Sequence, residues 1–284
     1  MITGGNSGIG FQTARELAAH GARVVLACRN RASAEAAAAR IDGAADVLDL
    51  DLAAMDSVRA AADAWDGPLD LLVNNAGVMA PPKRRTSGDG FELQFATNHL
   101  GHFVLTGLLL PALVKAEPGG RVVTVSSITH HNASEAVLDA NAAGPYNPQK
   151  TYANSKLANL LFALELQREL EARDIAVTSV AAHPGVSATG LFGDREGMGA
   201  NPFLRIAGPV FTRALTQPAA SGARAVLYAA TEAAPGSYTG PQRFGETRGR
   251  IGTARLSELA KDEKLARRLW HRSEELTGFR YAWT

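Results

Sequence analysis

The chain of 284 residues has one cysteine, Cys28, and almost no net charge. A single cysteine excludes an intramolecular disulfide and is typical of a reducing compartment, so we expect a cytoplasmic protein. The 29 Lys and Arg residues against 28 Asp and Glu give a net charge of +1, which argues against a nucleic-acid partner or a membrane surface. No apolar run approaches the roughly 18 residues of a membrane span, so we expect no membrane partner.

Apolar segments typical of buried strands alternate with stretches typical of helices along most of the chain. The expected strands are 23–28, 46–50, 69–73, 121–125 and 175–180, and the expected helices are 9–20, 31–41, 53–65, 89–116, 151–173 and 218–231. This alternation predicts right-handed crossovers and a parallel sheet with helices on both faces. We therefore expect an α/β fold, a single doubly wound Rossmann domain of three layers (αβα) over 1–284, with an amphipathic helical tail at about 253–280.

The chain opens with a glycine-rich stretch, MITGGNSGIG, in which Gly4, Gly8 and Gly10 bracket a turn ahead of a helix. Glycines let backbone N–H groups approach a pyrophosphate closely, and a helix N-terminus favours its negative charge. The spacing differs from the standard G-x-G-x-x-G fingerprint. Taken alone, the loop is therefore equally compatible with an ordinary glycine-rich turn.

Only Met1 and Ile2 stand before this loop, where a buried strand is expected. Such a truncated first strand would lie between the strands 23–28 and 69–73 and leave backbone groups unpaired on both. We expect this to weaken stability and cofactor binding, and we expect the natural chain to begin upstream of Met1.

Further motifs follow the loop in a fixed order. They are Asn74-Asn75-Ala76-Gly77 after a strand, Asn98 in a helical run, Ser126-Ser127 after another strand, Tyr152-Ala153-Asn154-Ser155-Lys156 at the start of a long helix, and His183-Pro184-Gly185 after the strand 175–180. Together with the loop, this set resembles the classical short-chain dehydrogenase/reductase family over nearly the whole chain. The resemblance implies a nicotinamide cofactor and an oxidoreductase that interconverts a carbonyl and an alcohol.

Tyr152 and Lys156 are four residues apart on a helix and therefore share one face. A nearby ammonium is expected to lower the tyrosine pKa from about 10, so that Tyr152 can give or take the hydroxyl proton while hydride moves to or from nicotinamide. The resemblance selects Ser127 over Ser126 as the residue that holds the substrate oxygen. It also implies that Lys156 binds the nicotinamide ribose and that Asn98 positions a water. Each of these residues, taken singly, is also compatible with an ordinary structural role.

The strand 23–28 ends without the carboxylate that binds the ribose 2′-hydroxyl in NAD sites. Arg29 stands there instead and suits a 2′-phosphate, to which Asn6 and Ser7 could add hydrogen bonds. We therefore predict NADP(H) in preference to NAD(H), the alternative being that Arg29 is a solvated charge. The cofactor-binding residues expected from these arguments and from the resemblance are Gly4, Asn6, Ser7, Gly8, Ile9, Gly10, Arg29, Asn30, Asp51, Leu52, Asn75, Ala76, Gly77, Tyr152, Lys156, Pro184, Gly185, Val186 and Thr189. Asp51 could also cap the helix at 53–65.

Three features resemble the retinol dehydrogenase-like branch of the family. They are the spacing of 25 positions between Ser127 and Tyr152, the segment ACRN at 27–30 and the tail RRLWHRSEELTG. The insertion between Ser127 and Tyr152 contains His130 and His131. No third metal ligand stands at a useful spacing from these two, so we expect no metal.

The segment 186–217 combines several glycines with large apolar side chains, which predicts a mobile lid over a hydrophobic substrate. The same side chains are equally compatible with core packing or an oligomer contact. The expected function is an NADP(H)-dependent oxidoreductase acting on a small-to-medium carbonyl or alcohol. The alternative is a cofactor-binding sensor on the same fold, and monomer and homo-oligomer both remain open.

Overall fold

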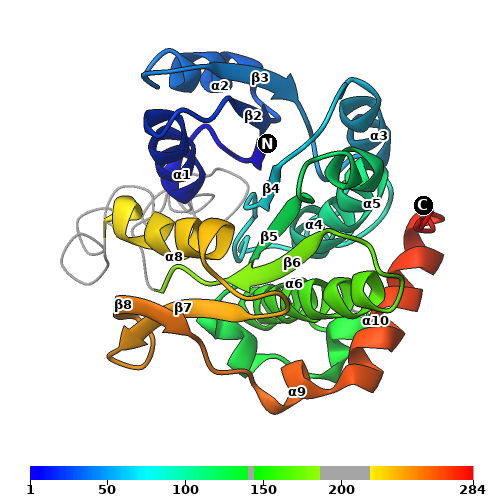
Figure 1. Ribbon diagram of the computed structural model, residues 1–284. Helices are drawn as coiled ribbons and strands as arrows, with labels where there is room; N and C mark the ends of the chain where they lie inside the picture. The colour runs from blue at the N-terminus through cyan, green and yellow to red at the C-terminus, as the bar shows by residue number, and fades with distance from the viewer. Residues whose placement is uncertain (140–143, 186–217, 284) are drawn as a thin grey trace.

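The computed structural model describes residues 1–139, 144–185 and 218–283. In this part of the chain, eight strands form one sheet in the order β3-β2-β1-β4-β5-β6-β7-β8 (Figure 1). The strands are β1 (Ile2–Thr3), β2 (Val24–Cys28), β3 (Ala45–Asp49), β4 (Leu71–Asn74), β5 (Arg121–Val125), β6 (Thr178–Ala182), β7 (Tyr238–Arg243) and β8 (Arg248–Thr253). All neighbours run parallel except β7 and β8.

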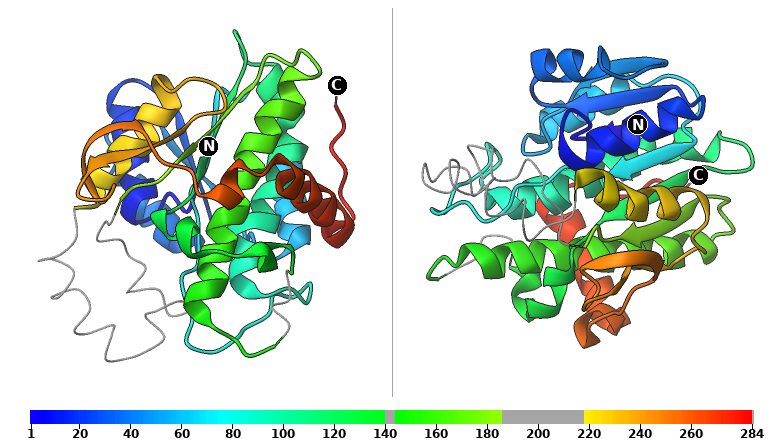
Figure 2. Two further views of the ribbon diagram at one scale, coloured as in Figure 1. Left: turned by 90° about the horizontal axis from the view of Figure 1, so that it is seen from below. Right: turned by 90° about the vertical axis from the view of Figure 1, so that its left-hand side faces the viewer.

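Helices cover both faces of the sheet, as Figure 2 shows. One face carries α1 (Gly8–Ala19), α2 (Arg31–Ala38) and α8 (Ala219–Thr231). The other carries α3 (Met55–Asp63), α4 (Leu93–Phe95), the π-helical turn η1 (Ala96–Leu100), α5 (Gly101–Val114), α6 (Pro148–Glu171), α9 (Glu258–Lys261) and α10 (Glu263–Thr277). Two 3₁₀ turns, η2 (Ile128–Asn132) and η3 (Glu135–Leu138), lie between β5 and α6. The expected doubly wound α/β fold is therefore confirmed.

The sheet differs from the expected one at its far edge. β7 and β8 were not predicted, and β8 runs antiparallel, so the sheet is mostly rather than wholly parallel. The reason is visible in the sequence of β8, RGRIGT, which has two arginines and two glycines and is largely exposed. An edge strand of this kind lacks the apolar run by which buried strands are recognised.

β1 is the short strand that the sequence predicts. It pairs with β2 at Ile2 and Thr3 and with β4 at Ile2. The expected loss of pairing on the β4 side is nevertheless wrong, because Met1 continues the ladder there. Its carbonyl oxygen accepts from Val73 N at 2.9 Å, and its own nitrogen donates to the Leu71 carbonyl at 2.7 Å.

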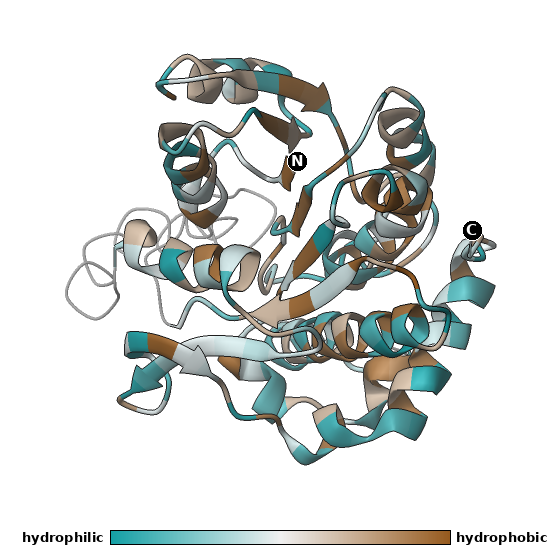
Figure 3. Ribbon diagram, in the orientation of Figure 1, coloured by the Kyte–Doolittle hydropathy of each residue, from teal (hydrophilic) through white to brown (hydrophobic). Residues whose placement is uncertain are grey.

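The helical run at 93–114 corrects another expectation. By length and composition it could span a membrane, although no such run was recognised in the sequence. It is apolar for another reason, since 72% of its most apolar window is buried between the sheet and α3, α6 and α10. Figure 3 shows the same concentration of apolar residues along the strands and on the helix sides that face them.

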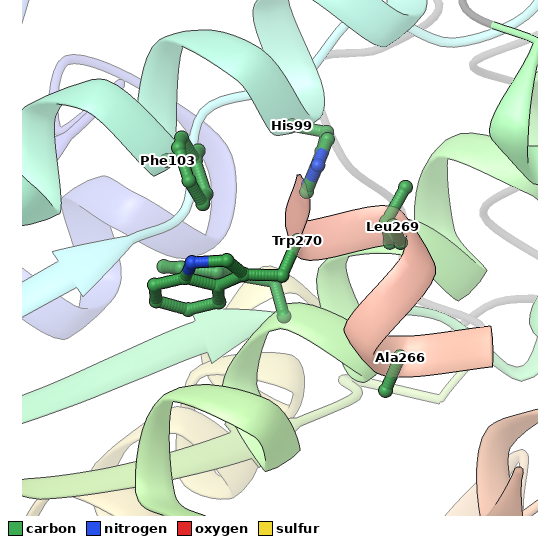
Figure 4. Close-up of a pocket in the computed structure, with 6 residues that line it drawn as sticks. His99, Phe103, Ala266, Leu269 and Trp270 are labelled. Atoms are coloured by element: carbon green, nitrogen blue, oxygen red, sulfur yellow. The ribbon is translucent and has the colours of Figure 1, made fainter. Parts of the chain in front are cut away.

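The C-terminal tail closes this face of the sheet. Its helical part is two helices, α9 and α10, and α10 packs against α6. His99 points toward Leu269 and Trp270 on α10, and Phe103 on α5 lies beside them (Figure 4). These side chains leave no space for a water between them. Beyond α10, Tyr281 packs its ring on Phe103 and donates a hydrogen bond to the Phe103 carbonyl. The expected lid at 186–217 lies outside the described residues.

Gly107 marks the place where the tail crosses α5. A Cβ there would overlap Cε1 of Phe279 and lie 2.9 Å from Cε2 of Tyr281. We predict that Gly107→Val lowers the free energy of unfolding by about 2 kcal/mol, because overpacking must displace these rings. Thermal melting measures this loss. Gly88→Val is the matched control, since a Cβ at Gly88 meets no atom within 4 Å, and Phe279→Ala should make Gly107→Val less harmful. Equal melting temperatures for the two valine variants would contradict the close approach.

Candidate functional site

Most of the residues singled out in the sequence come together at the carboxyl edge of the sheet. The β1–α1 loop, the segment after β4, Ser126 and Ser127 after β5, and His183 after β6 all follow parallel strands. The carboxyl ends of neighbouring parallel strands meet at one edge, which is where ligands bind in doubly wound folds.

The glycine-rich loop forms a cradle that side chains would fill. Gly4 and Gly8 have φ of +62° and +55°, a region that favours glycine. A Cβ at Gly10 would lie only 2.5 Å from both the Gly4 oxygen and Asn75 Nδ2. α1 begins at Gly8, and the preceding Ser7 makes no side-chain cap, so the first N–H groups of the helix are open to an anion. The cradle therefore fits a dinucleotide pyrophosphate. Ile9 instead faces the core.

The segment after β4 is tied to this loop through Thr3, which sequence reasoning missed. The N–H groups of Asn75 and Ala76 both donate to Thr3 Oγ1 at 2.9 Å, and Asn75 Nδ2 donates to the Thr3 carbonyl at 2.8 Å. Gly77 lies against the acid/base residues, because a Cβ there would be 3.4 Å from Lys156 Nζ.

Ser127, Tyr152 and Lys156 lie together at the end of β5. The Ser127 side chain lies near enough to the Tyr152 hydroxyl to lower its pKa, whereas Ser126 Oγ donates to the Lys156 carbonyl at 2.7 Å. Lys156 Nζ donates to the Val125 carbonyl at 3.1 Å and lies 5.7 Å from the centre of the Tyr152 ring. Ser127 is thus the serine that faces Tyr152, as expected, while Ser126 is part of the packing between β5 and α6.

Burial sets the protonation of this group. It raises the pKa of Tyr152 to about 12, and the Ser127 side chain lowers this pKa by a smaller amount. Burial also lowers the pKa of Lys156 to about 8. The expectation that the tyrosine pKa is lowered is therefore wrong for the chain itself, because burial disfavours the charged phenolate.

Asn98 lies in the π-helical turn η1, a distortion that often marks functional sites. Its side chain clamps the backbone of Val78, accepting from the nitrogen at 2.8 Å and donating to the oxygen at 3.0 Å. It also donates to Ser155 Oγ at 2.9 Å, and Ser155 Oγ donates to the Tyr152 carbonyl at 2.8 Å. Asn98 is therefore bound to the helix that carries Tyr152.

The end of β2 carries the residues expected to choose the cofactor. Arg29 and Ser7 are exposed there. Asn6 Nδ2 donates to Ser33 Oγ at 3.0 Å, and Asn30 Oδ1 caps α2 by accepting from Ser33 N at 2.8 Å. Asn6 and Asn30 thus hold the start of α2 beside the loop.

Asp51 and Leu52, which follow β3, have roles that differ in part from the expected ones. Asp51 Oδ1 accepts from Ala53 N at 2.9 Å, but α3 begins later, at Met55, and Met55 N donates to Asp89 at 3.1 Å. The expectation that Asp51 caps this helix is therefore wrong. Leu52 is 4% exposed, and its carbonyl would overlap a Cβ placed at Gly101.

The segment after β6 is described only in part. Gly185 has φ of +69°, and its N–H donates to His183 Nδ1 at 3.3 Å. Pro184 lies between them. The expected cofactor residues Val186 and Thr189 lie outside the described residues.

Two histidines near the site make hydrogen bonds there that the sequence does not predict. His130 Nδ1 donates to the Ser127 carbonyl at 2.8 Å, and His130 Nε2 accepts from Ser257 N at 3.3 Å. His102 is buried and bridges Thr3 and Asn98. Each ring has one partner within four residues and a second partner 99 or 127 residues away, and no local pattern contains the second partner.

Comparisons with known proteins agree with this geometry. A family profile described as short chain dehydrogenase matches residues 1–198. Retinol dehydrogenase 14 from Mus musculus is 38% identical over 98% of this chain and 85% of its own length. Polyprenol dehydrogenase from Mus musculus is 40% identical over 98% of this chain and 83% of its own length.

A crystal structure of an uncharacterised protein from Mycobacterium paratuberculosis has a TM-score of 0.83 and 43% identity, and covers 99% of this chain and 94% of that one. The resemblance to the retinol dehydrogenase-like branch is confirmed by the curated relatives. The chain therefore belongs to the short-chain dehydrogenase family, oxidoreductases that act on alcohols or carbonyls with a nicotinamide cofactor.

Proposed function

We propose that this protein is an NADP(H)-dependent oxidoreductase that interconverts a carbonyl and an alcohol on a hydrophobic substrate, with Tyr152 as the acid/base. The observation that carries the proposal is that Ser127, Tyr152 and Lys156 lie together at the end of β5, beside Gly77 and the glycine cradle. A proton-transfer group next to a dinucleotide site is what hydride chemistry at a carbonyl requires.

In the reductive direction, the hydride for the carbonyl carbon would come from a nicotinamide coenzyme held by the glycine cradle and Lys156. The Tyr152 phenol keeps its proton at neutral pH, because burial raises its pKa to about 12, and it gives that proton to the carbonyl oxygen. Ser127 donates a hydrogen bond to the same oxygen and so orients the carbonyl. Hydride and proton together convert the carbonyl to an alcohol, and oxidation of an alcohol reverses both transfers.

The coenzyme itself would be held along the carboxyl edge of the sheet. The first turn of α1 and the loop from Gly4 would bind its pyrophosphate, and Lys156 the nicotinamide ribose. Pro184 and Gly185 would lie along the nicotinamide. Asn98 would position a water that returns protons to the site.

The substrate class rests on the names of the relatives and on composition. Two relatives are named after retinol and polyprenol, which are apolar alcohols. The segment 186–217 is rich in large apolar side chains. A panel of aldehydes, ketones and alcohols of increasing apolar size, read by NADPH absorbance, tests the proposal. Binding of NADPH without turnover of any of them would favour a sensor instead.

The two neighbouring serines give a matched test of the catalytic group. We predict that Ser127→Ala and Tyr152→Phe each lower kcat by about 10²- to 10⁴-fold, since each removes a group from the reacting oxygen. Ser126→Ala should keep kcat within about threefold and lower only the melting temperature, because it loses one hydrogen bond to the Lys156 carbonyl. Steady-state kinetics measures both. Full activity in Tyr152→Phe would refute the acid/base role.

Cofactor choice is tested at the two ends of β2. We predict that Arg29→Asp lowers the ratio of kcat/KM for NADPH over NADH by roughly ten- to a hundredfold, because a carboxylate repels the 2′-phosphate and accepts from a 2′-hydroxyl. Arg23→Ala is the control, since Arg23 pairs with Asp46 at the opposite end of the strand. An unchanged ratio in Arg29→Asp would contradict the assignment of Arg29.

A further inference from the structure

The proposed mechanism gives no role to His102, a buried histidine at the site. His102 stands in the first turn of α5 and is 1% exposed. Its Nδ1 lies 2.9 Å from the Asn98 carbonyl oxygen, and its Nε2 lies 2.8 Å from Thr3 Oγ1. The ring therefore spans the gap between the coenzyme loop and the π-helical turn.

The protons of this bridge can be assigned. A carbonyl oxygen only accepts, so the hydrogen is on His102 Nδ1 and points at Asn98. Burial lowers the pKa of His102 to about 4, and the Lys156 ammonium on α6 acts in the same direction, so the ring is neutral at pH 7. His102 Nε2 then carries a lone pair, to which the Thr3 hydroxyl donates its hydrogen.

The Thr3 hydroxyl is fully used in this arrangement. Its oxygen lies 2.8 Å from His102 Nε2 and 3.3 Å from the Val73 carbonyl oxygen, so its hydrogen points to the nearer acceptor, His102 Nε2. Its two acceptor sites receive the N–H groups of Asn75 and Ala76. A hydroxyl offers one donor and two acceptor positions, so all three are filled. His102 thereby fixes the direction of the hydroxyl that joins β1 to the segment after β4. Gly4, the first glycine of the cradle, follows directly.

The other end of the bridge reaches the acid/base residues. The carbonyl that His102 binds belongs to Asn98, whose amide holds Ser155, and Ser155 holds the Tyr152 carbonyl. One ring thus connects the coenzyme loop to the helix that carries Tyr152 through hydrogen bonds alone.

We propose that His102 is a positioning residue that couples the coenzyme loop at Thr3 to the turn at Asn98, and that its two ring nitrogens serve these two ends separately. Nε2 supports coenzyme affinity through Thr3, and Nδ1 supports turnover through Asn98. This inference rests on the proposed function. A histidine that merely fills space would not divide its contribution in this way.

Two amide variants separate the two contacts. His102→Asn keeps a donor near Nδ1 and loses the acceptor for Thr3, whereas His102→Gln keeps an acceptor near Nε2 and loses the donor to Asn98. We expect His102→Asn to raise the Kd of NADPH about tenfold, the loss of one buried hydrogen bond. His102→Gln should keep that Kd within about twofold and lower kcat about tenfold. The NADPH Kd is measured by fluorescence titration without substrate.

Variants of Thr3 test the same contact independently, in case a histidine variant folds poorly. Thr3→Val should raise the NADPH Kd by a similar factor, and Thr3→Ser, which keeps the hydroxyl, should restore it. The double variant Thr3→Val/His102→Asn should bind no more weakly than Thr3→Val alone, because both remove the same contact.

The neutral ring is tested by pH. An unfolded histidine binds a proton below about pH 6.5, whereas folded His102 resists one down to about pH 4, so its contribution to stability is full above pH 6.5 and is lost as pH falls. The melting-temperature difference between wild type and His102→Gln should therefore shrink from pH 7 to pH 5. Lys156 and His99, whose charges interact with that of His102, are present in both proteins, so their own titration cancels in the difference.

The outcomes distinguish this inference from the proposed function. Additive effects of Thr3→Val and His102→Asn, or a folded His102→Asn that binds NADPH as wild type does, would overturn the coupling while leaving the oxidoreductase intact. A constant melting-temperature difference from pH 7 to pH 5 would overturn the neutral tautomer. Failure of the wild type to bind NADPH or NADH would instead refute the proposed function.

Discussion

Everything at the carboxyl edge depends on how closely three backbone segments approach one another there. The first turn of α1, the loop after β1 and the segment after β4 meet at Gly10, where even a methyl group would lie 2.5 Å from Gly4 and Asn75. This contact brings the helix N-terminus to the strand ends and leaves its N–H groups facing a ligand rather than a side chain. It also places Thr3 where it can hold both segments. The cradle is therefore a property of packing as much as of glycine content.

Burial governs the chemistry beside the cradle. It shifts the pKa of three groups toward their neutral forms, raising that of Tyr152 and lowering those of Lys156 and His102. A neutral phenol is a proton donor, and a neutral imidazole can donate at one nitrogen and accept at the other. The same desolvation thus supports two different tasks on neighbouring helices, proton transfer in one case and orientation in the other.

The sequence predicted the parts of this site whose signal is local. The glycine loop and the four-residue spacing of Tyr152 and Lys156 can be recognised within a few residues, and the buried strands by their apolar runs. The bridge from Thr3 to His102 joins residues 99 apart, so no local pattern contains it. The prediction that the Tyr152 pKa is lowered was wrong for a related reason. The desolvation that raises this pKa comes from burial by the whole fold, which no local pattern contains. β8 was missed because an exposed edge strand carries no apolar run.

The tail beyond α9 has a consequence for how the chain is made. In the part of the chain that the structure describes, α10, Phe279, Tyr281 and the residues around them cover an apolar face of α5 and α6. Synthesis proceeds from the N-terminus, so the ribosome releases this face long before it releases its cover. Until α10 has been synthesised, the nascent chain therefore exposes this apolar surface while its nucleotide-binding half can already pair its strands, and exposed apolar surface of this kind favours aggregation.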